Sequence, residues 1–468
     1  MSITEMRTSS AVSAARELRT VMQGRVVLRG DDDYARMRQI WNRAVENQPA
    51  LLAICETSVD VQAAVRAARR YKLPLSVRCG GHDWAGRALC ANGLVIDLTR
   101  MREVVVDMHS RVATVAGGAS SKDVAAAAGA HGLVAALGNC GAVGMSGLTL
   151  GGGYGSLIGL CGLAADNLLG AEVVLADGRR VTTGPDEEPE LFWAIRGGGG
   201  NFGVVTSFEF QAYEVGPTVF AGLVFYRGED AAQVLRGFGE AAATAPDELS
   251  MAANLTTAPP LPFLPEDIHG KPIVAVLGVW SGRPEDGDAA TQPFRRLAPV
   301  VADVFSPMPY LAMQTLLDPL YPRGMWNYFR SAFFGHLDGT TIDALVAAYA
   351  EAPNAVSELH VHHLGGAMGR VPADATAFGT RDREFILNTV ARTPGAEGFD
   401  TVVEWARSAC AALGPDAASY VNFTGEASEE GVRASYPAAT YARLASTKGR
   451  YDPTNLFRLN QNIRPSAA

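Results

Sequence analysis

Two glycine-rich stretches decide how this chain is organised: RCGGHDWAG at residues 78–86 and GNCGAVGMSGLTLGGGYG at residues 138–155. Glycine lacks a Cβ atom, so it occurs where the backbone must bend tightly or approach a ligand closely. Successive backbone N–H groups in such loops form concave anion sites that suit a pyrophosphate. Each stretch also holds one nucleophile, His82 in the first and Cys140 in the second. Two such loops facing one space predict a cofactor that is held covalently.

The composition is that of a globular protein with two or more domains. The 468 residues are too many for one ordinary core, and a hydrophobic share of 48% and a charged share of 19% give no sign of disorder. A net charge of −9 argues against nucleic acid as a partner. No apolar run approaches the about 20 residues that span a bilayer, and residues 1–23 lack the apolar core of a signal peptide. We therefore expect no membrane association and a cytoplasmic location.

The cysteines give no sign of a metal site or of a disulfide framework. All six lie far apart, and no two form a CxxC pair, so we expect neither a zinc site nor any other metal. In a cytoplasmic protein disulfides are not expected either. Most of these thiols are interpreted as small buried hydrophobic groups. Cys140, between glycines, needs another explanation.

The hydrophobic pattern predicts an α+β fold in three parts, residues 1–213, 214–415 and 416–468. The first part alternates strands at 26–28, 51–55, 75–78, 94–98, 112–115, 171–175, 180–183 and 204–210 with helices at 10–21, 34–42, 60–71, 121–131 and 190–195. The middle part has strands at 218–226, 273–280 and 357–363 and helices at 230–243 and 341–350, which indicates an antiparallel sheet covered by helices. The last part has a helix at 436–448.

Four motifs follow one another over most of the chain. They are GGH at residues 80–82, CxxVG at 140–144 running into LGGGxG at 150–155, RGGGGNFG at 196–203, and YDP at 451–453 with NQNI at 460–463. In this order they resemble the berberine-bridge-enzyme-like oxidases, a branch of the FAD-linked oxidases with the PCMH-type, or vanillyl-alcohol-oxidase, fold. The resemblance implies an FAD-binding domain made of residues 1–213 and 416–468, with a substrate-binding domain of residues 214–415 inserted between them.

The resemblance also implies how FAD is held. The position matching His82 binds the flavin 8α-methyl carbon through imidazole, and the position matching Cys140 binds flavin C6 through sulfur. Asn460 and Asn462, near the end of the chain, approach the flavin or brace it. The remaining residues expected to bind the cofactor are Arg78, Gly80, Gly81, Asp83, Gly144, Gly147, Leu150, Gly151, Gly152, Gly155, Asn201, Gly203 and Val204.

The segment ELHVHHLGG at residues 358–366 is the strongest candidate for chemistry in the middle part. Alternate residues of a strand share a face, so His360 and His362 point together and His363 points away. Imidazole, with an ordinary pKa near ~6.5, can accept a substrate proton at neutral pH. We expect a role as base or in positioning the substrate, with His362 ranked before His360. The alternatives are a hydrogen-bonded surface strand or a metal pair, which lacks a third ligand.

Three aromatic positions bear on the substrate. Trp84 stands where the family usually has a tyrosine lining the substrate pocket, although it equally suits a core. Phe423 stands where many sugar- and alcohol-oxidising relatives have a tyrosine base, and phenylalanine cannot take a proton. If residues 420–423 form a strand, Tyr420 and Asn422 share a face, and neither simply replaces Phe423. Tyr420 is nevertheless kept as a candidate catalytic residue, and Arg381 is interpreted as holding a loop.

These observations favour an FAD-dependent oxidase with a doubly attached flavin. Its substrate would be a small-molecule alcohol or amine of secondary metabolism, or a scaffold that cyclises after oxidation, with O2 as electron acceptor and H2O2 as product. The open alternatives are a dehydrogenase with another acceptor, a carbohydrate oxidase, and a flavin-binding protein without turnover. A nicotinamide enzyme is disfavoured, because no strand runs into GxGxxG with an acidic residue about 20 positions later. The protein is expected to be a monomer or a homodimer.

Overall fold

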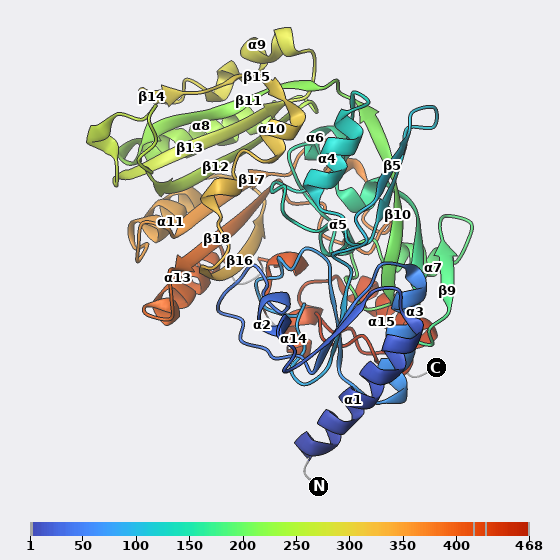
Figure 1. The fold of residues 1–468 in the computed structure, drawn as a ribbon. Coiled ribbons are helices and arrows are strands. Elements are labelled where there is room, and N and C mark those ends of the chain that lie inside the picture. The colour runs from blue at the N-terminus through green and yellow to red at the C-terminus, as the bar shows by residue number, and fades with distance from the viewer. Residues whose placement is uncertain (1–2, 415–416, 426–427, 467–468) are drawn as a thin grey trace.

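The computed structural model describes residues 3–414, 417–425 and 428–466, with side chains from residue 9 onward, and arranges them around three β-sheets (Figure 1). The first sheet has the strand order β1-β2-β4-β3, in which β2 and β3 run parallel to β4 and β1 is antiparallel to β2. Its strands are β1 (Arg25–Leu28), β2 (Leu51–Ile54), β3 (Leu75–Arg78) and β4 (Leu94–Asp97). Helices α1 (Ile3–Val21) and α3 (Ser58–Arg70) pack against it with their apolar sides.

The predicted helix at residues 34–42 is largely wrong, because α2 spans only Tyr34–Met37. Beyond α2 the backbone N–H of Trp41 donates to the Gly81 carbonyl at 3.0 Å. The side-chain Nδ2 of Asn42 donates to the Trp84 carbonyl at 2.6 Å. These tertiary hydrogen bonds hold the loop that carries His82, and they override the local preference for a helix.

The second sheet is antiparallel, with the order β5-β6-β10-β8-β9 and with β7 beside β10. Its strands are β5 (Val104–Asp107), β6 (Val112–Ala116), β7 (Leu133–Ala135), β8 (Leu168–Val174), β9 (Arg180–Thr183) and β10 (Val204–Glu214). The short strands β5 and β7 have no counterpart among the predicted elements. The helices of this region are α4 (Ser121–Gly129), α5 (Met145–Leu150), α6 (Ile158–Cys161), η1 (Ala164–Asn167) and α7 (Pro189–Ala194).

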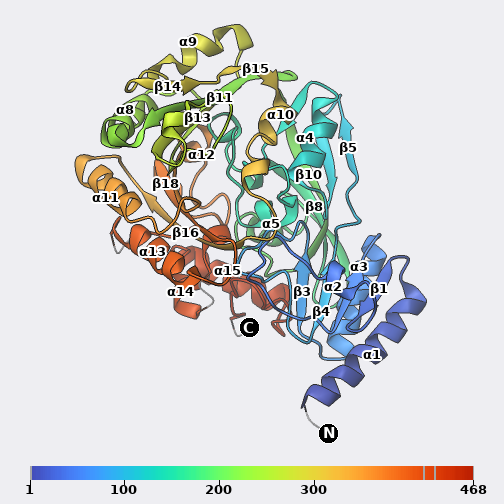
Figure 2. The same cartoon turned by 60° about the vertical axis from the view of Figure 1, so that its left-hand side comes forward.

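The third sheet is antiparallel throughout, with the order β14-β11-β13-β12-β17-β18-β16 and with β15 beside β11. Its strands are β11 (Thr218–Arg227), β12 (Leu249–Thr257), β13 (Pro272–Trp280), β14 (Val300–Asp303), β15 (Ser306–Pro309), β16 (Trp326–Phe334), β17 (Glu358–His363) and β18 (Phe385–Thr393). Helices α8 (Ala231–Ala243), α11 (Gly339–Ala350) and α13 (Phe399–Ala411) cover one face (Figures 1 and 2). The α+β class and the helix-covered antiparallel sheet are thus confirmed.

The connections between the strands of the third sheet carry several short helices. They are α9 (Gly287–Thr291), α10 (Tyr310–Gln314), α12 (Ala367–Arg370), η2 (Gly228–Asp230), η3 (Glu266–Ile268), η4 (Pro284–Asp286), η5 (Gln292–Phe294) and η6 (Asp318–Leu320). Within the described ranges, no helix combines the length and the apolar character needed to cross a membrane.

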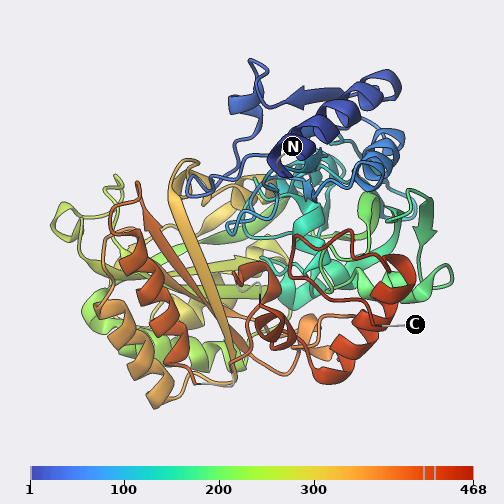
Figure 3. The ribbon, with the colours of Figure 1, turned by 90° about the horizontal axis from the view of Figure 1, so that it is seen from below.

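The end of the chain returns to its first half. The last elements are η7 (Val421–Phe423), α14 (Glu429–Arg433) and α15 (Ala438–Tyr451), and α15 lies beside α7 (Figures 1 and 3). The buried ammonium of Lys448 fixes this return, because its Nζ contacts the Asp452 carboxylate at 2.7 Å, the Asn201 carbonyl at 2.6 Å and the Phe457 carbonyl at 2.9 Å. One buried charge therefore joins α15, the loop at Asn201 and the chain terminus.

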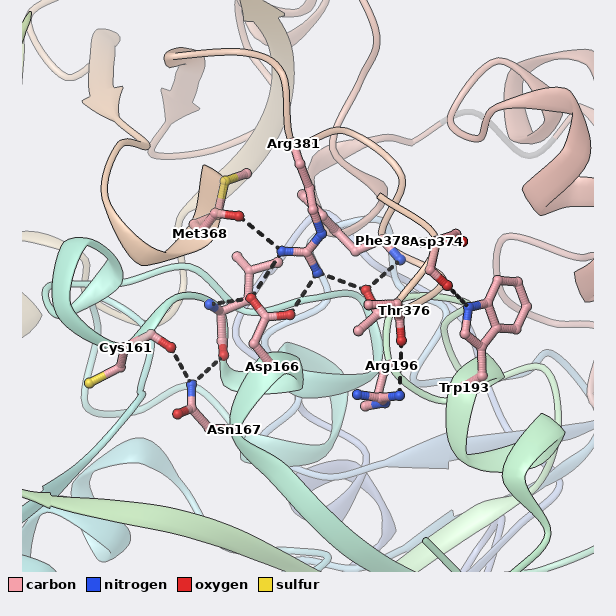
Figure 4. Close-up of polar contacts among 12 residues, drawn as sticks. Cys161, Asp166, Asn167, Trp193, Arg196, Met368, Asp374, Thr376, Phe378 and Arg381 are labelled. Carbon is pink, nitrogen blue, oxygen red and sulfur yellow. Dashed lines mark hydrogen bonds and ion pairs between the residues drawn. The ribbon is translucent and has the colours of Figure 1, made fainter. Parts of the chain in front are cut away.

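A buried ion pair joins the third sheet to the second (Figure 4). Arg381 contacts the Asp166 carboxylate at 2.6 Å and also donates to the Met368 carbonyl and the Thr376 hydroxyl. The neighbouring Trp193 indole donates to the Asp374 carbonyl at 2.8 Å. Arg381 therefore holds a loop, as the sequence analysis expects, and this loop is pinned against η1 and α7.

Replacing Arg381 should destabilise the whole molecule. Arg381→Met leaves the Asp166 carboxylate buried without its counter-charge, and losing one partner of a buried pair costs about 3–5 kcal/mol. Urea unfolding followed by tryptophan fluorescence would measure the loss as a lower midpoint. Arg370→Met is the matched control, because its ion pair with Asp247 is exposed and worth at most about 1 kcal/mol. Equal midpoints for both variants would contradict this role of Arg381.

Candidate active site

A cavity of about 400 Å³ lies where residues from all three sheets meet. Its size is within the range typical of small-molecule and cofactor sites. The loop after β3 contributes His82, the loop before α5 contributes Cys140, and β17 contributes His360 and His362. Side chains that lie far apart in the sequence therefore face one shared cavity.

His82 is held with a ring nitrogen unused. Gly81, with φ +69°, turns the chain into the loop, and the His82 ring stacks on Trp41 with centroids 5.2 Å apart. Burial, assisted by the Arg323 charge, lowers the pKa of His82 to about 4, so its imidazole is neutral at pH 7. Its buried Nε2 has no hydrogen-bond partner in the part of the chain that the structure describes. A neutral imidazole keeps a lone pair on one ring nitrogen, which nucleophilic attack requires.

Cys140 lies half-buried against a carboxylate. Its thiol donates to Oδ1 of Asp318 at 3.0 Å, and the Gly141 N–H donates to the same oxygen at 3.0 Å. Burial and this hydrogen bond raise the pKa of Cys140 to about 12. The thiol is therefore protonated at neutral pH, with an acceptor for its proton already in contact.

Glycine is required where the two loops meet. A Cβ at Gly80 would lie 2.6 Å from the Gly144 nitrogen, and a Cβ at Gly144 would lie 2.4 Å from the Cys79 sulfur. Gly147, in contrast, lines the cavity and has no atom within 4 Å of a Cβ position, so a side chain there would meet open space. The two loops therefore form a close-packed cradle with one open side, which fits a group held against the backbone.

The expected cofactor-binding residues fall into two sets. The set that lines the cavity is His82, Cys140, Gly80, Gly81, Asp83, Gly144, Gly147, Leu150, Gly203, Val204 and Asn460. The set that lies behind the lining is Arg78, Gly151, Gly152, Gly155, Asn201 and Asn462.

Three residues of the second set make contacts that support the loops. Arg78 forms a buried ion pair with Asp97 at the end of β3. Gly155 packs so closely on the Leu137 carbonyl that a Cβ would lie 1.9 Å from its oxygen. Asn201 donates to the Gln461 carbonyl at 3.1 Å and accepts from the backbone N–H of residue 463 at 3.0 Å. The unpaired imidazole nitrogen, the thiol and the open cradle together fit a dinucleotide held against these loops.

The two histidines of β17 face the cavity with ring centroids 6.1 Å apart, while His363 packs on Phe385. Burial, with a contribution from the His360 charge, lowers the pKa of His362 to about 3. His362 contacts the ring of Tyr154 edge-on, with centroids 5.2 Å apart. The Nε2 of His360 lies 2.7 Å from the Glu358 carboxylate. The two rings share a face but have different electrostatic surroundings.

The expected strand at residues 420–423 is wrong, because Val421–Phe423 forms the 3₁₀ turn η7. This turn lets Tyr420, Asn422 and Phe423 all line the cavity. The Tyr420 hydroxyl accepts from the Gly153 N–H at 2.8 Å and from Asn422 Nδ2 at 2.9 Å. Burial raises the pKa of Tyr420 to about 12, so its hydroxyl stays protonated. Trp84 is both buried and part of the lining, packed edge-on against Tyr328.

Sequence reasoning missed several residues of the lining. Asn254 on β12 and Asn388 on β18 are the register neighbours of His360, and each has a buried Oδ1 with no hydrogen-bond partner among the described residues. Tyr154 and Tyr321 also line the cavity. Strand register places Asn254 and Asn388 beside His360, and no local sequence pattern predicts this register. Tyr154 lies inside the LGGGxG motif at residues 150–155, and an aromatic residue among glycines could have marked it as part of the lining.

The comparisons with known proteins agree with this site. A family model described as "FAD binding domain" matches residues 49–184, and one described as "Berberine and berberine like" matches residues 419–464. The chain is 32% identical to (R)-6-hydroxynicotine oxidase of Paenarthrobacter nicotinovorans over 96% of this chain and 98% of that protein.

Solved structures agree as well. The crystal structure of 6-hydroxy-D-nicotine oxidase from Arthrobacter nicotinovorans superposes with a TM-score of 0.85 at 30% identity, covering 95% of this chain and 98% of that one. Glucooligosaccharide oxidase from Acremonium strictum has a TM-score of 0.85 at 24% identity, covering 98% and 100%, and shows the shared fold. Fold and site are thus those of an FAD-linked oxidoreductase with the PCMH-type fold. The chain belongs to the berberine-bridge-enzyme-like family.

The buried neutral imidazole of His362 should make stability depend on pH. Its pKa is lowered in the folded state to about 3, so the unfolded chain binds this proton first as the pH falls. The stability that this group allows is complete above about pH 6.5 and is lost as the pH falls towards 3. His362→Gln should flatten the slope of the unfolding free energy between pH 6.5 and 4 by about 1.4 kcal/mol per pH unit.

Urea unfolding at several pH values in this range measures that slope. His109→Gln removes an exposed imidazole outside the cavity and controls for the loss of a histidine as such. If the His362→Gln slope equalled that of the unaltered protein, His362 would not be buried in its neutral form.

Proposed function

We propose that this enzyme is an oxidase that carries FAD attached through both His82 and Cys140 and that oxidises a small-molecule alcohol or amine. The observation that carries the proposal is that an imidazole with an unpaired nitrogen, a thiol and a pair of histidines all line one cavity. When bound, FAD supplies two-electron chemistry, in which it takes a hydride equivalent from the substrate and returns the electrons to O2 as H2O2. Residues 1–213 and 416–468 would hold the FAD, and residues 214–415 would hold the substrate.

The residues present suit double attachment. Acremonium strictum glucooligosaccharide oxidase carries a 6-S-cysteinyl, 8α-N1-histidyl FAD according to its structure title, and the same two residue types face this cavity. Asp318 lies 3.0 Å from the Cys140 sulfur and is placed to take the thiol proton when the sulfur reacts. A doubly tethered cofactor would stay in place in an open site without relying on non-covalent affinity.

The polar groups of the third sheet favour a substrate that donates hydrogen bonds. The side chains of Asn254 and Asn388 are 8% and 5% exposed, and their Oδ1 atoms have no partner in the described part of the chain. A buried unpaired amide oxygen costs free energy until a ligand satisfies it. A hydroxyl or an amine on the substrate would do so and would lie beside the histidines of β17, one of which would take the substrate proton.

The aromatic lining limits the alternatives. Phe423 stacks on Phe329 and packs edge-on against Tyr154, so it contributes an apolar wall and no base. This favours an alcohol or amine of secondary metabolism, or a scaffold that cyclises on oxidation, over a carbohydrate. A cytoplasmic location and a monomeric or dimeric state stay predictions.

Both attachments can be tested on the purified protein. Acid denaturation should leave the yellow colour in the pellet, and the intact mass should be higher by one FAD. His82→Ala and Cys140→Ala should each keep the flavin through the remaining bond, and the double variant should release it to the supernatant. Colour in the supernatant from the unaltered protein would rule out covalent attachment.

The oxidase activity can be tested by flavin bleaching. A panel with (R)-6-hydroxynicotine, other secondary amines, aromatic alcohols and xylobiose would be mixed anaerobically with the protein, and air would then be admitted. We expect an amine or alcohol to bleach the flavin, and we expect colour to return with H2O2 release. Asn254→Leu and Asn388→Leu should each slow bleaching at low substrate concentration by up to about tenfold, because each removes an acceptor worth up to about 1.5 kcal/mol. Slow return of colour in air would favour a dehydrogenase, and bleaching by xylobiose alone would favour a carbohydrate oxidase.

A further inference from the structure

We propose that Glu358 and His360 form a carboxylate–imidazole pair in which His360 accepts the substrate proton, while Glu358, Tyr321 and Arg392 position it. The inference rests on the proposed function, because it names the base of that same site. It separates the two candidate histidines of β17 by what each one touches.

The pair is built from buried side chains in direct contact. Glu358 and His360 are two residues apart on β17 and therefore share the face that looks into the cavity. They are 9% and 7% exposed, and Nε2 of His360 lies 2.7 Å from Oε2 of Glu358. The Tyr321 hydroxyl donates to the same carboxylate oxygen at 3.0 Å and lies 3.3 Å from the imidazole nitrogen.

Arg392 fixes the other end of the carboxylate. Its Nη2 lies 2.6 Å from Oε1 of Glu358, and its remaining nitrogens donate to the carbonyls of Val356 at 3.0 Å and Leu320 at 2.8 Å. The guanidinium also lies over the Tyr321 ring at 4.7 Å. Both carboxylate oxygens of Glu358 thus have hydrogen-bond or ion-pair partners, and Arg392 is itself fixed by two backbone carbonyls. Such an arrangement is expected around a residue that must keep one orientation.

Glu358 is held as a carboxylate. Its burial opposes ionisation, but the hydrogen bond from His360, the Arg392 charge and the Tyr321 hydroxyl outweigh burial and lower the pKa of Glu358. An ionised carboxylate only accepts hydrogen bonds, so Nε2 of His360 carries the hydrogen. The lone pair of the neutral ring is then on Nδ1, which has no hydrogen-bond partner among the described residues. A carboxylate that sets the histidine tautomer and stabilises the imidazolium works in the same way in serine hydrolases.

His362 lacks these partners. Its ring packs on Tyr154, no described carboxylate touches it, and burial lowers its pKa to about 3, which makes it a weak base at pH 7. Strand register adds a second difference. The neighbours of His360 are Asn254 and Asn388, whose amide oxygens need donors, whereas the neighbours of His362 are Ala252 and Ile386. On this face of the sheet, the unpaired polar side chains therefore lie around His360 and not around His362.

The titratable and charged groups near His360 come from three elements. Glu358 and His362 lie on β17 itself, Tyr321 comes from the segment after η6, and Arg392 reaches it through Glu358 from β18. Burial raises the pKa of Tyr321 well above its ordinary range, so its hydroxyl stays a donor.

The tautomer of His360 can be measured without any substrate. Nuclear magnetic resonance of the flavin-containing protein with ¹⁵N-labelled histidine, assigned with His360→Gln, should show His360 with its hydrogen on Nε2 at pH 7.5. In Glu358→Gln the side-chain amide can donate to Nε2, so the hydrogen should move to Nδ1. Glu384→Gln is the matched control, because Glu384 contacts the exposed His336 outside the cavity. A hydrogen on Nδ1 in the unaltered protein, or an unchanged tautomer in Glu358→Gln, would overturn the proposal.

The catalytic consequence is measured with whichever panel compound bleaches the flavin fastest. Glu358→Gln and His360→Gln should slow anaerobic flavin reduction about 10²–10⁴-fold and change its pH profile, with the flavin content per protein unchanged. Glu358→Asp should recover part of the rate, because it keeps the carboxylate. Tyr321→Phe keeps the packing and removes one donor, so we expect a loss of at most about tenfold.

These results separate the two proposals. If no compound bleaches the flavin although the tautomer moves as expected, the oxidase assignment fails and the pair stands. If a compound bleaches the flavin and Glu358→Gln, with full flavin content, reacts at the unaltered rate and pH profile, the pair fails and the oxidase assignment stands.

Discussion

The backbone contact between Gly80 and Gly144 is the constraint on which the site depends. Neither position has room for a Cβ, so the loop after β3 and the loop before α5 touch directly. His82 is two residues beyond one contact point and Cys140 is four residues before the other. Their side chains consequently reach the same cavity with little freedom to move apart. The imidazole and the thiol thereby face one cavity because of glycine geometry, without any bond between them.

The second requirement is that the third sheet stays against this cradle. Two buried contacts connect the third sheet to the rest of the molecule. One is the Arg381–Asp166 ion pair, and the other is the Asn42 side chain, which donates to the carbonyls of both Trp84 and Asn327. Buried polar contacts of this kind are costly to break because each partner would be left unsatisfied. They hold β17 against the cradle, so the cradle residues and the histidines that line the same cavity belong to different sheets.

Short-range sequence patterns predicted the structure correctly where strand periodicity alone sets which way the side chains point. Period-two alternation placed His360 and His362 on one face and His363 on the other, as β17 shows. The same rule failed at residues 420–423, because the chain turns there so that the Tyr420 hydroxyl can accept from the Gly153 N–H. The predicted helix at residues 34–42 is wrong beyond residue 37, where bonds to the His82 loop replace helical ones. In both places long-range hydrogen bonds compete with local preference, and they are invisible in a single segment.

The sequence by itself determined the family, the α+β class, the two glycine loops with their nucleophiles, and the histidine face of one strand. These features follow from the order of the motifs along the chain and from the short-range periodicity of its residues, both of which can be seen in the sequence. Only the tertiary structure decided which groups meet these residues: Asp318 at Cys140, Asn254 and Asn388 beside His360, and Arg392 and Tyr321 around Glu358. Strand register and the packing of distant loops set these contacts. Both depend on segments far apart in the sequence, so no single segment predicts them.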